Sequence, residues 1–83
     1  MDTILVGVYL PAAGKEYELR LPRAMNSLLA AHLAAEALSD LSGGEYLPSR
    51  SSLFAKRGRG QLLDMNRSLE ENGIVNGSQL LLI

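Results

Sequence analysis

The residues able to perform acid–base chemistry or bind a metal are few in this 83-residue chain. His32 is the only histidine, and Glu36 follows it at a spacing that places both side chains on one face of a helix. Cysteine is absent, so there is no thiolate nucleophile and no sulfur ligand for a metal. A histidine–carboxylate pair without these partners is typical of a solvated helix surface. We therefore expect no enzymatic activity, no metal and no cofactor.

A basic cluster, Lys56-Arg57-Gly58-Arg59-Gly60, is the second group with binding chemistry. Cations on a glycine turn can hold a phosphate or an acidic helix end, which makes Lys56, Arg57 and Arg59 a candidate basic contact. The alternative is a solvated hairpin, because no stacking aromatics are interleaved and the net charge of the chain is -1. We expect no nucleic-acid partner.

Length and composition predict one globular domain spanning residues 1–83. Hydrophobic residues make up 47% of the chain and charged residues 20%, which is too apolar for disorder. The absence of cysteine fits a reducing compartment. The apolar run from Ile4 to Leu10 is too short to span a bilayer, and Asp2 precedes it where a signal peptide would carry positive charge. We expect a cytoplasmic protein without direct membrane insertion.

Two strands and a helix are predicted in the first half of the chain. Residues Thr3 to Leu10 are apolar on both faces, as in a central strand, whereas Glu16 to Leu21 alternate strictly. Gly14 allows a hairpin between them. Asn26 or Ser27 caps a helix that runs to about Leu41 and stops at Gly43-Gly44.

The second half predicts shorter elements. They are a third strand over Ser51 to Lys56, a turn at Gly58-Arg59-Gly60, a return strand at Gln61-Leu62-Leu63, a helical turn over Ser68 to Asn72 and a final strand at Ser78 to Ile83 after the turn Asn76-Gly77. Ser68 is the predicted cap of the helical turn, and Glu70 and Glu71 favour its N-terminus.

The predicted helix has an apolar arc wider than one core face requires. Its polar residues His32, Glu36, Ser39 and Asp40 share one side, and the core face opposite carries Ala30, Ala34, Leu38 and Leu41 with Ala31 and Ala37 beside them. Leu29 and Leu33 lie on the flank. Either the loop at Tyr46-Leu47 covers that flank, or a partner helix or a second copy does, which would make the protein a homodimer.

The order of elements is that of an α+β fold, ββαββ with a short helical turn, in which a mixed sheet of four to five strands wraps one helix. In its closing segment, Ser68-Leu69-Glu70-Glu71-Asn72-Gly73-Ile74 followed by Asn76-Gly77 and Leu80-Leu81-Leu82-Ile83, the chain resembles ubiquitin. The resemblance implies the ubiquitin-like β-grasp fold, with the first and last strands paired in parallel at the centre of the sheet.

Within that superfamily the chain resembles the small YukD/EsaB proteins of bacterial type VII (WXG-type) secretion systems and the cytosolic domain of the EccD membrane subunit. The likeness covers nearly the whole chain and rests on Tyr17-Glu18-Leu19-Arg20-Leu21-Pro22, on Gly60-Gln61-Leu62-Leu63 and on the closing segment. These residues are specific for the fold more than for any chemistry, and an alanine-rich helix and the Gly43-Gly44 and Tyr46 loop depart from the pattern.

A protein-binding patch follows from the likeness to ubiquitin, whose recognition surface lies on the open face of the sheet. The matching positions are Leu53, Leu81, Ile83 and Ala12. Since side chains alternate along a strand, Leu81 and Ile83 share one face and Leu80 and Leu82 the other. We expect Leu53, Leu81 and Ile83 to form an apolar docking patch; the alternative is a scatter of exposed apolar atoms.

The resemblance implies a non-catalytic ubiquitin-like module, accessory or regulatory in type VII secretion, with secretion-machine subunits as partners. We expect it not to be conjugated, because the chain ends in Leu82-Ile83 and lacks the di-glycine of conjugated relatives. Two alternatives stay open: a ubiquitin-like modifier or sulfur carrier if the sequence is truncated, and a stand-alone scaffold domain unrelated to secretion.

Overall fold

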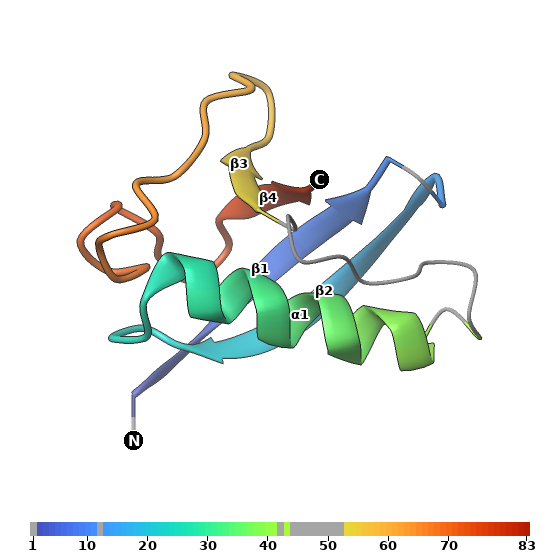
Figure 1. The fold of residues 1–83 in the computed structure, drawn as a ribbon, viewed down its shortest axis with the longest axis horizontal. Helices are drawn as coiled ribbons and strands as arrows, with labels where there is room; N and C mark the ends of the chain where they lie inside the picture. The colour runs from blue at the N-terminus through green and yellow to red at the C-terminus, as the bar shows by residue number, and fades with distance from the viewer. Residues whose placement is uncertain (1, 12, 42, 44–52) are drawn as a thin grey trace.

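The computed structural model describes residues 2–11, 13–41, 43 and 53–83, which form a four-stranded mixed sheet with one helix across it (Figure 1). The strand order is β2-β1-β4-β3. The elements are β1 at Thr3–Leu10, β2 at Lys15–Pro22, α1 at Ser27–Leu41, β3 at Phe54–Lys56 and β4 at Gln79–Leu82. β1 pairs antiparallel with β2 and parallel with β4, and β4 pairs antiparallel with β3. The predicted β-grasp topology, with first and last strands parallel at the centre, is confirmed.

The two central strands divide their side chains between the faces of the sheet as their alternation predicts. On β1 the helix side carries the buried residues Ile4, Val6, Val8 and Leu10, and on β4 it carries Leu80 and Leu82. Burying large aliphatic side chains of this kind stabilises the fold by roughly 1.5–3 kcal/mol each. The core therefore lies between α1 and one face of the sheet, and the opposite face is left open.

Helix α1 begins and ends where local chemistry dictates. The N–H groups of Leu28 and Leu29 donate to Asn26 Oδ1 at 3.0 and 3.2 Å, so Asn26 is the N-cap. At the other end Gly43 has a φ of 66°, and its N–H donates to Asp40 O at 3.2 Å. A residue with a side chain rarely adopts that conformation, which explains the glycine there.

The core face of α1 differs from the prediction at two positions. Ala30, Ala31, Ala34, Ala35 and Leu38 are buried, whereas Ala37 is exposed and Leu41 is 60% exposed. The buried stripe runs along Ala31 and Ala35 instead of turning toward Ala37 and Leu41. Leu41 is also the last residue of the helix. The core is thus built largely from alanines, which let the helix sit close to the sheet.

The third and fourth predicted strands are shorter in the structure. β3 covers only Phe54–Lys56, and the start of the predicted strand at Ser51 lies outside the described residues. The predicted return strand at 61–63 is instead an isolated bridge between Leu62 and Ala55. Two backbone hydrogen bonds flank this bridge, from Lys56 N–H to Gln61 O at 2.8 Å and from Leu63 N–H to Phe54 O at 3.1 Å, and the turn between the two segments has two glycines with positive φ.

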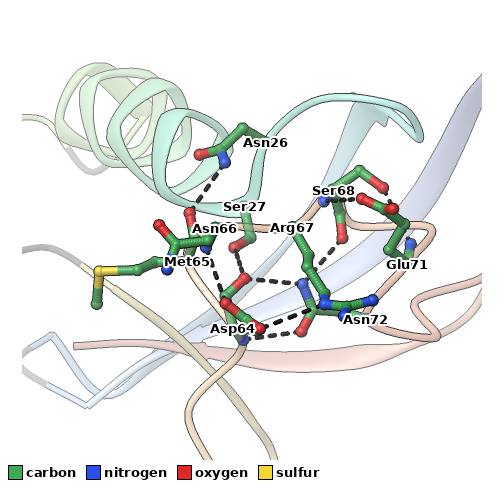
Figure 2. Close-up of polar contacts among 9 residues, drawn as sticks. All are labelled: Asn26, Ser27, Asp64, Met65, Asn66, Arg67, Ser68, Glu71 and Asn72. Atoms are coloured by element: carbon green, nitrogen blue, oxygen red, sulfur yellow. Dashed lines mark hydrogen bonds and ion pairs between the residues drawn. The ribbon is translucent and has the colours of Figure 1, made fainter.

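A polar clasp joins the segment before β4 to the start of α1 (Figure 2). Asn72 is its centre: its Oδ1 accepts from Asp64 N–H at 2.8 Å, and its Nδ2 donates to Asp64 O and Ser68 O at 3.0 and 2.9 Å. Ser27 Oγ donates to Asp64 O at 2.8 Å, and Asn26 Nδ2 donates to Met65 O at 2.9 Å. These bonds fix the irregular chain that leads into the central strand β4.

Ser68 starts the turn beyond that clasp as predicted. Glu71 N–H donates to Ser68 Oγ at 3.0 Å, and Ser68 N–H donates to Glu71 Oε1 at 2.9 Å, which is a capping box. The hydrogen bonds from the Ser68 backbone and hydroxyl lower the pKa of the Glu71 carboxyl below its ordinary value. The segment forms hydrogen-bonded turns around the buried Leu69.

No helix among the described residues is long and apolar enough to span a bilayer.

Candidate functional site on the open face of the sheet

The structure brings together three of the four residues of the predicted patch. Leu53 and Ile83 exchange both backbone hydrogen bonds, at 2.8 and 3.0 Å, so they lie opposite one another just beyond the paired ends of β3 and β4. Leu81 is one step along the same face of β4 from Ile83, because alternate residues share a face. Leu53 and Leu81 are half-buried, and Ile83 is 55% exposed. The fourth residue, Ala12, lies outside the described residues.

We call Leu53, Leu81 and Ile83 the open-face patch. Their neighbours Phe54 and Leu82 face the helix and are 2% and 1% exposed, so the alternation predicted from the sequence holds at this corner. Leu81 lies within β4, and Leu53 and Ile83 lie at the hydrogen-bonded ends just beyond β3 and β4. Apolar side chains held on a rigid backbone lose little entropy on binding, which suits a docking surface.

A second group on the open face borders the patch. Tyr9 on β1 lies beside Leu81 in the parallel register, and the Arg57 guanidinium stacks 4.7 Å from the Tyr9 ring centroid. Arg57 Nη1 also forms an ion pair with the Glu16 carboxylate of β2. A cation over an aromatic face contributes about 0.5–1 kcal/mol when exposed. The Arg57–Glu16 ion pair and the Arg57–Tyr9 stack therefore form a polar group on the open face, next to the apolar patch.

Gly7, in the middle of the open face, leaves space for the Gln79 side chain. A Cβ at Gly7 would lie 2.6 Å from Gln79 Oε1, so the Gln79 amide rests directly over the glycine. Gly7 and Gln79 are partners in the β1–β4 register. The middle of the open face is flat and polar as a result, and the apolar patch is confined to the β3–β4 end.

The predicted basic contact is only partly available. The Arg57 guanidinium stacks on Tyr9 and forms an ion pair with Glu16, and Lys56 is half-buried. Arg59 is exposed at the tip of the turn. Together these three cations line one side of a shallow groove of about 250 Å³. The hairpin thus contributes more to the rim of the open face than to an independent anion site.

Helix α1 presents a separate apolar stripe to solvent. Leu29 and Leu33, the predicted flank, are 51% and 43% exposed, and the exposed Ala37 and Leu41 continue the stripe at the same four-residue spacing. The loop at Tyr46-Leu47, the alternative cover for this flank, lies outside the described residues. Leu29 and Leu33 are therefore exposed, and the partner that would cover them stays a prediction.

His32 is less exposed than the solvated helix surface predicted for it. The structure shows no hydrogen bond or ion pair between His32 and Glu36. His32 is instead half-buried, with Nε2 enclosed and lacking a hydrogen-bond partner. Among the described residues, no three or more histidine, cysteine or acidic side chains are placed to hold a metal ion.

Sequence reasoning missed the Tyr9–Arg57–Glu16 group and the clasp around Asn72. Alternation alone places Tyr9 and Glu16 on the open face, but Arg57 reaches them only through the β3–β4 pairing and the turn that follows β3. The signal available was the single tyrosine on an otherwise aliphatic strand.

Comparison with solved structures shows the ubiquitin-like fold. The chain is similar to the ubiquitin-like domain of the Mycobacterium tuberculosis type VII secretion system protein EccD1, with 23% identity, a TM-score of 0.77, and coverage of 100% of this chain and 99% of that one. It is similar to Caldiarchaeum subterraneum ubiquitin at 17% identity and a TM-score of 0.66, covering 99% of this chain and 92% of that one. The fold is therefore ubiquitin-like β-grasp.

Two further solved structures are similar to the chain over its whole length. The EccD5 ubiquitin-like domain of Mycobacterium xenopi matches with 16% identity and a TM-score of 0.78, covering 100% of this chain and 94% of that one. A chain of the MycP5-free ESX-5 inner membrane complex matches with 18% identity and a TM-score of 0.76, covering 100% of this chain and 21% of that one. No protein-family model and no curated protein matches the sequence.

Proposed function

We propose that this protein is a non-catalytic, cytoplasmic ubiquitin-like module that serves a bacterial type VII secretion apparatus by docking a protein partner on the open-face patch. The observation that carries the proposal is the juxtaposition of Leu53, Leu81 and Ile83 on the face opposite the helix. The secretion assignment is supported by the similarity to the EccD1 and EccD5 ubiquitin-like domains. The resemblance to the YukD/EsaB proteins belongs to the same proposal.

The chemistry of the patch suits protein recognition. Interfaces bury a compact apolar centre inside a polar rim, with aromatic and arginine side chains enriched. Here the apolar centre is the open-face patch, and Tyr9, Arg57 and Glu16 supply the rim next to it. Burying Ile83, which is 55% exposed, and the half-buried leucines would provide the main favourable term.

Subunits of the secretion machine are the partners we propose. A chain in the ESX-5 inner membrane complex contains a domain of this shape within a longer polypeptide. The present sequence would supply the same shape to the apparatus as a single domain spanning residues 1–83. Self-association through the stripe at Leu29 and Leu33 is a further proposal, and analytical ultracentrifugation would detect it.

An affinity experiment with matched variants tests the function. Tagged protein is used to recover partners from cytoplasm and membranes, and bound proteins are identified by mass spectrometry. Wild type should recover secretion-machine subunits, Leu81→Ser and Ile83→Asp should lose them, and Leu33→Ser should keep them because Leu33 lies on the helix instead. Circular dichroism confirms that each variant is folded.

Two outcomes would overturn parts of the proposal. Recovery of the same subunits by Leu81→Ser and Ile83→Asp would remove the open-face patch as the docking site. Failure of folded wild type to recover any secretion subunit, with those subunits present in the lysate, would remove the secretion assignment and leave the fold.

A further inference from the structure

The outer edge of β2 is a second surface, separate from the open-face patch. β2 is the terminal strand in the order β2-β1-β4-β3, so among the described residues one of its sides has no neighbouring strand. In Figure 1 it runs along the margin of the sheet beyond β1. Backbone groups on an edge strand can template the addition of another strand.

The hydrogen bonds of β1 determine which backbone groups of β2 face that edge. Gly7 N–H donates to Ser78 O at 2.9 Å, and Leu5 O accepts from Gly77 N–H at 2.8 Å. The odd-numbered residues of β1 therefore direct their backbone groups toward β4. Because direction alternates along a strand, the even-numbered residues direct theirs toward β2.

The β1–β2 register then determines which residues of β2 direct their backbone groups toward β1. Even-numbered residues of β1 lie opposite odd-numbered residues of β2, as in the pair Val6 and Leu19. The odd-numbered residues of β2 therefore bond to β1, and the even-numbered ones point away from the sheet. The outward N–H and C=O groups belong to Glu16, Glu18 and Arg20, and within the described part of the chain these three amide N–H groups have no hydrogen-bond partner.

The side chains along this edge define what an added strand must carry. On the helix side Tyr17 and Leu19 are partly buried against the core and still reach solvent, so they offer apolar contact. On the open side Glu18 is exposed and has no ion pair or hydrogen bond in the described structure, whereas Glu16 is held by Arg57. A cation opposite Glu18 would satisfy that charge.

We propose that the β2 edge binds an extended segment of a partner protein as a fifth strand, with apolar side chains facing the α1 side and a lysine or arginine opposite Glu18. The backbone groups of Glu16, Glu18 and Arg20 supply the affinity, and the alternating side chains supply the selectivity. This surface goes beyond the docking patch of the proposed function and is independent of it.

A second copy of this chain fits the edge less well than a different segment does. A two-fold antiparallel pairing centred on Glu18 places that carboxylate against its own copy, and one centred on Tyr17 places Glu16 against Glu18. A pairing centred on Leu19 places Glu16 opposite Pro22, which has no N–H to donate. Each register carries a fault that a heterologous strand avoids.

A peptide titration monitored by NMR tests the proposal. The probe is an acetylated and amidated heptapeptide, Thr-Val-Lys-Val-Lys-Val-Thr, added to the full ¹⁵N-labelled chain. Glu18→Pro removes an outward donor at a position where an edge strand tolerates proline, and Glu18→Ala is the matched control that keeps the donor. We expect the amide signals of Glu18 and Arg20 to shift in wild type, and Glu18→Pro to bind about fivefold more weakly than Glu18→Ala.

A charge reversal makes the test independent of folding losses. Glu18→Lys should bind the lysine peptide about threefold more weakly and a version with glutamates in place of both lysines about threefold more tightly. Leu81→Ser should leave peptide binding unchanged, which separates this surface from the open-face patch. The proposal is overturned by equal binding of Glu18→Pro and Glu18→Ala, by no binding at millimolar peptide, or by amide protection of Glu18 that depends only on protein concentration.

Discussion

Replacing Asn72 with alanine should destabilise the protein more than any other single change to an exposed or half-buried polar side chain described above. The Asn72 amide is half-buried and makes three hydrogen bonds, at 2.8, 3.0 and 2.9 Å, to backbone groups of Asp64 and Ser68. A net contribution of about 1 kcal/mol per bond gives about 3 kcal/mol. Water can reach some of the freed groups, so we expect a loss of about 2 kcal/mol in the free energy of unfolding.

Urea denaturation followed by circular dichroism measures this loss. Asn66→Ala is the matched control, because it deletes the same kind of side chain from the same segment. The Asn66 side chain makes no hydrogen bond in the described structure; only its backbone N–H donates, to Asp64 Oδ1 at 2.9 Å. Asn66→Ala should change the free energy by less than about 0.5 kcal/mol. The m-value should be the same in all three proteins, since each exposes the same surface on unfolding.

A loss below about 0.5 kcal/mol in Asn72→Ala, or equal losses in the two variants, would show that the three Asn72 hydrogen bonds do not stabilise this segment. The clasp would then be a consequence of how the chain enters β4 and not its cause. A large loss in both would show that the segment is sensitive to any side-chain deletion, so the loss could not be attributed to the three Asn72 hydrogen bonds.

Three further predictions follow from burial, capping and backbone conformation. Leu69→Ala should cost about 2–5 kcal/mol because Leu69 is fully buried, whereas Leu41→Ala should cost less than about 0.5 kcal/mol because Leu41 is 60% exposed; urea denaturation compares them. The pKa of Glu71 is lowered in the folded state, so its stabilising effect is present above the unfolded-state pKa and is lost as pH falls through the folded-state pKa; the stability difference between wild type and Glu71→Ala should therefore shrink from pH 7 to pH 3. Gly77 has a φ of 87°, so Gly77→Ala should lower the thermal midpoint more than Gly7→Ala, where the flexible end of Gln79 can move aside; equal midpoints would contradict this.

Local sequence chemistry predicted the elements whose determinants are close in the chain. The alternation of β1, the Asn26 cap, the Gly14 hairpin and the Ser68 turn each depend on neighbouring residues, and each appears in the structure. The same alternation placed Leu81 and Ile83 on the open face. Such features follow from φ, ψ preferences and side-chain period alone.

Contacts between residues that are far apart in the chain could not be predicted from local sequence. Ser27 and Asp64 meet across 37 residues, and Arg57 and Glu16 across 41, so their contacts require the tertiary path of the whole chain. Leu41 was assigned to the core because the helical period continues to it, yet the core stripe has turned away by the end of the helix. The enclosure of His32 Nε2 likewise reflects packing that its polar helix face does not predict.

We propose the open-face patch as the docking surface. The most direct measurement is a ¹⁵N NMR titration of the intact protein with a purified secretion-machine subunit recovered in the affinity experiment. We expect the amide signals of Leu53, Leu81 and Ile83 to shift or broaden first while those of α1 around Leu33 stay in place. Changes confined to α1, with the β3–β4 corner unperturbed, would contradict it and identify the helix stripe as the interface.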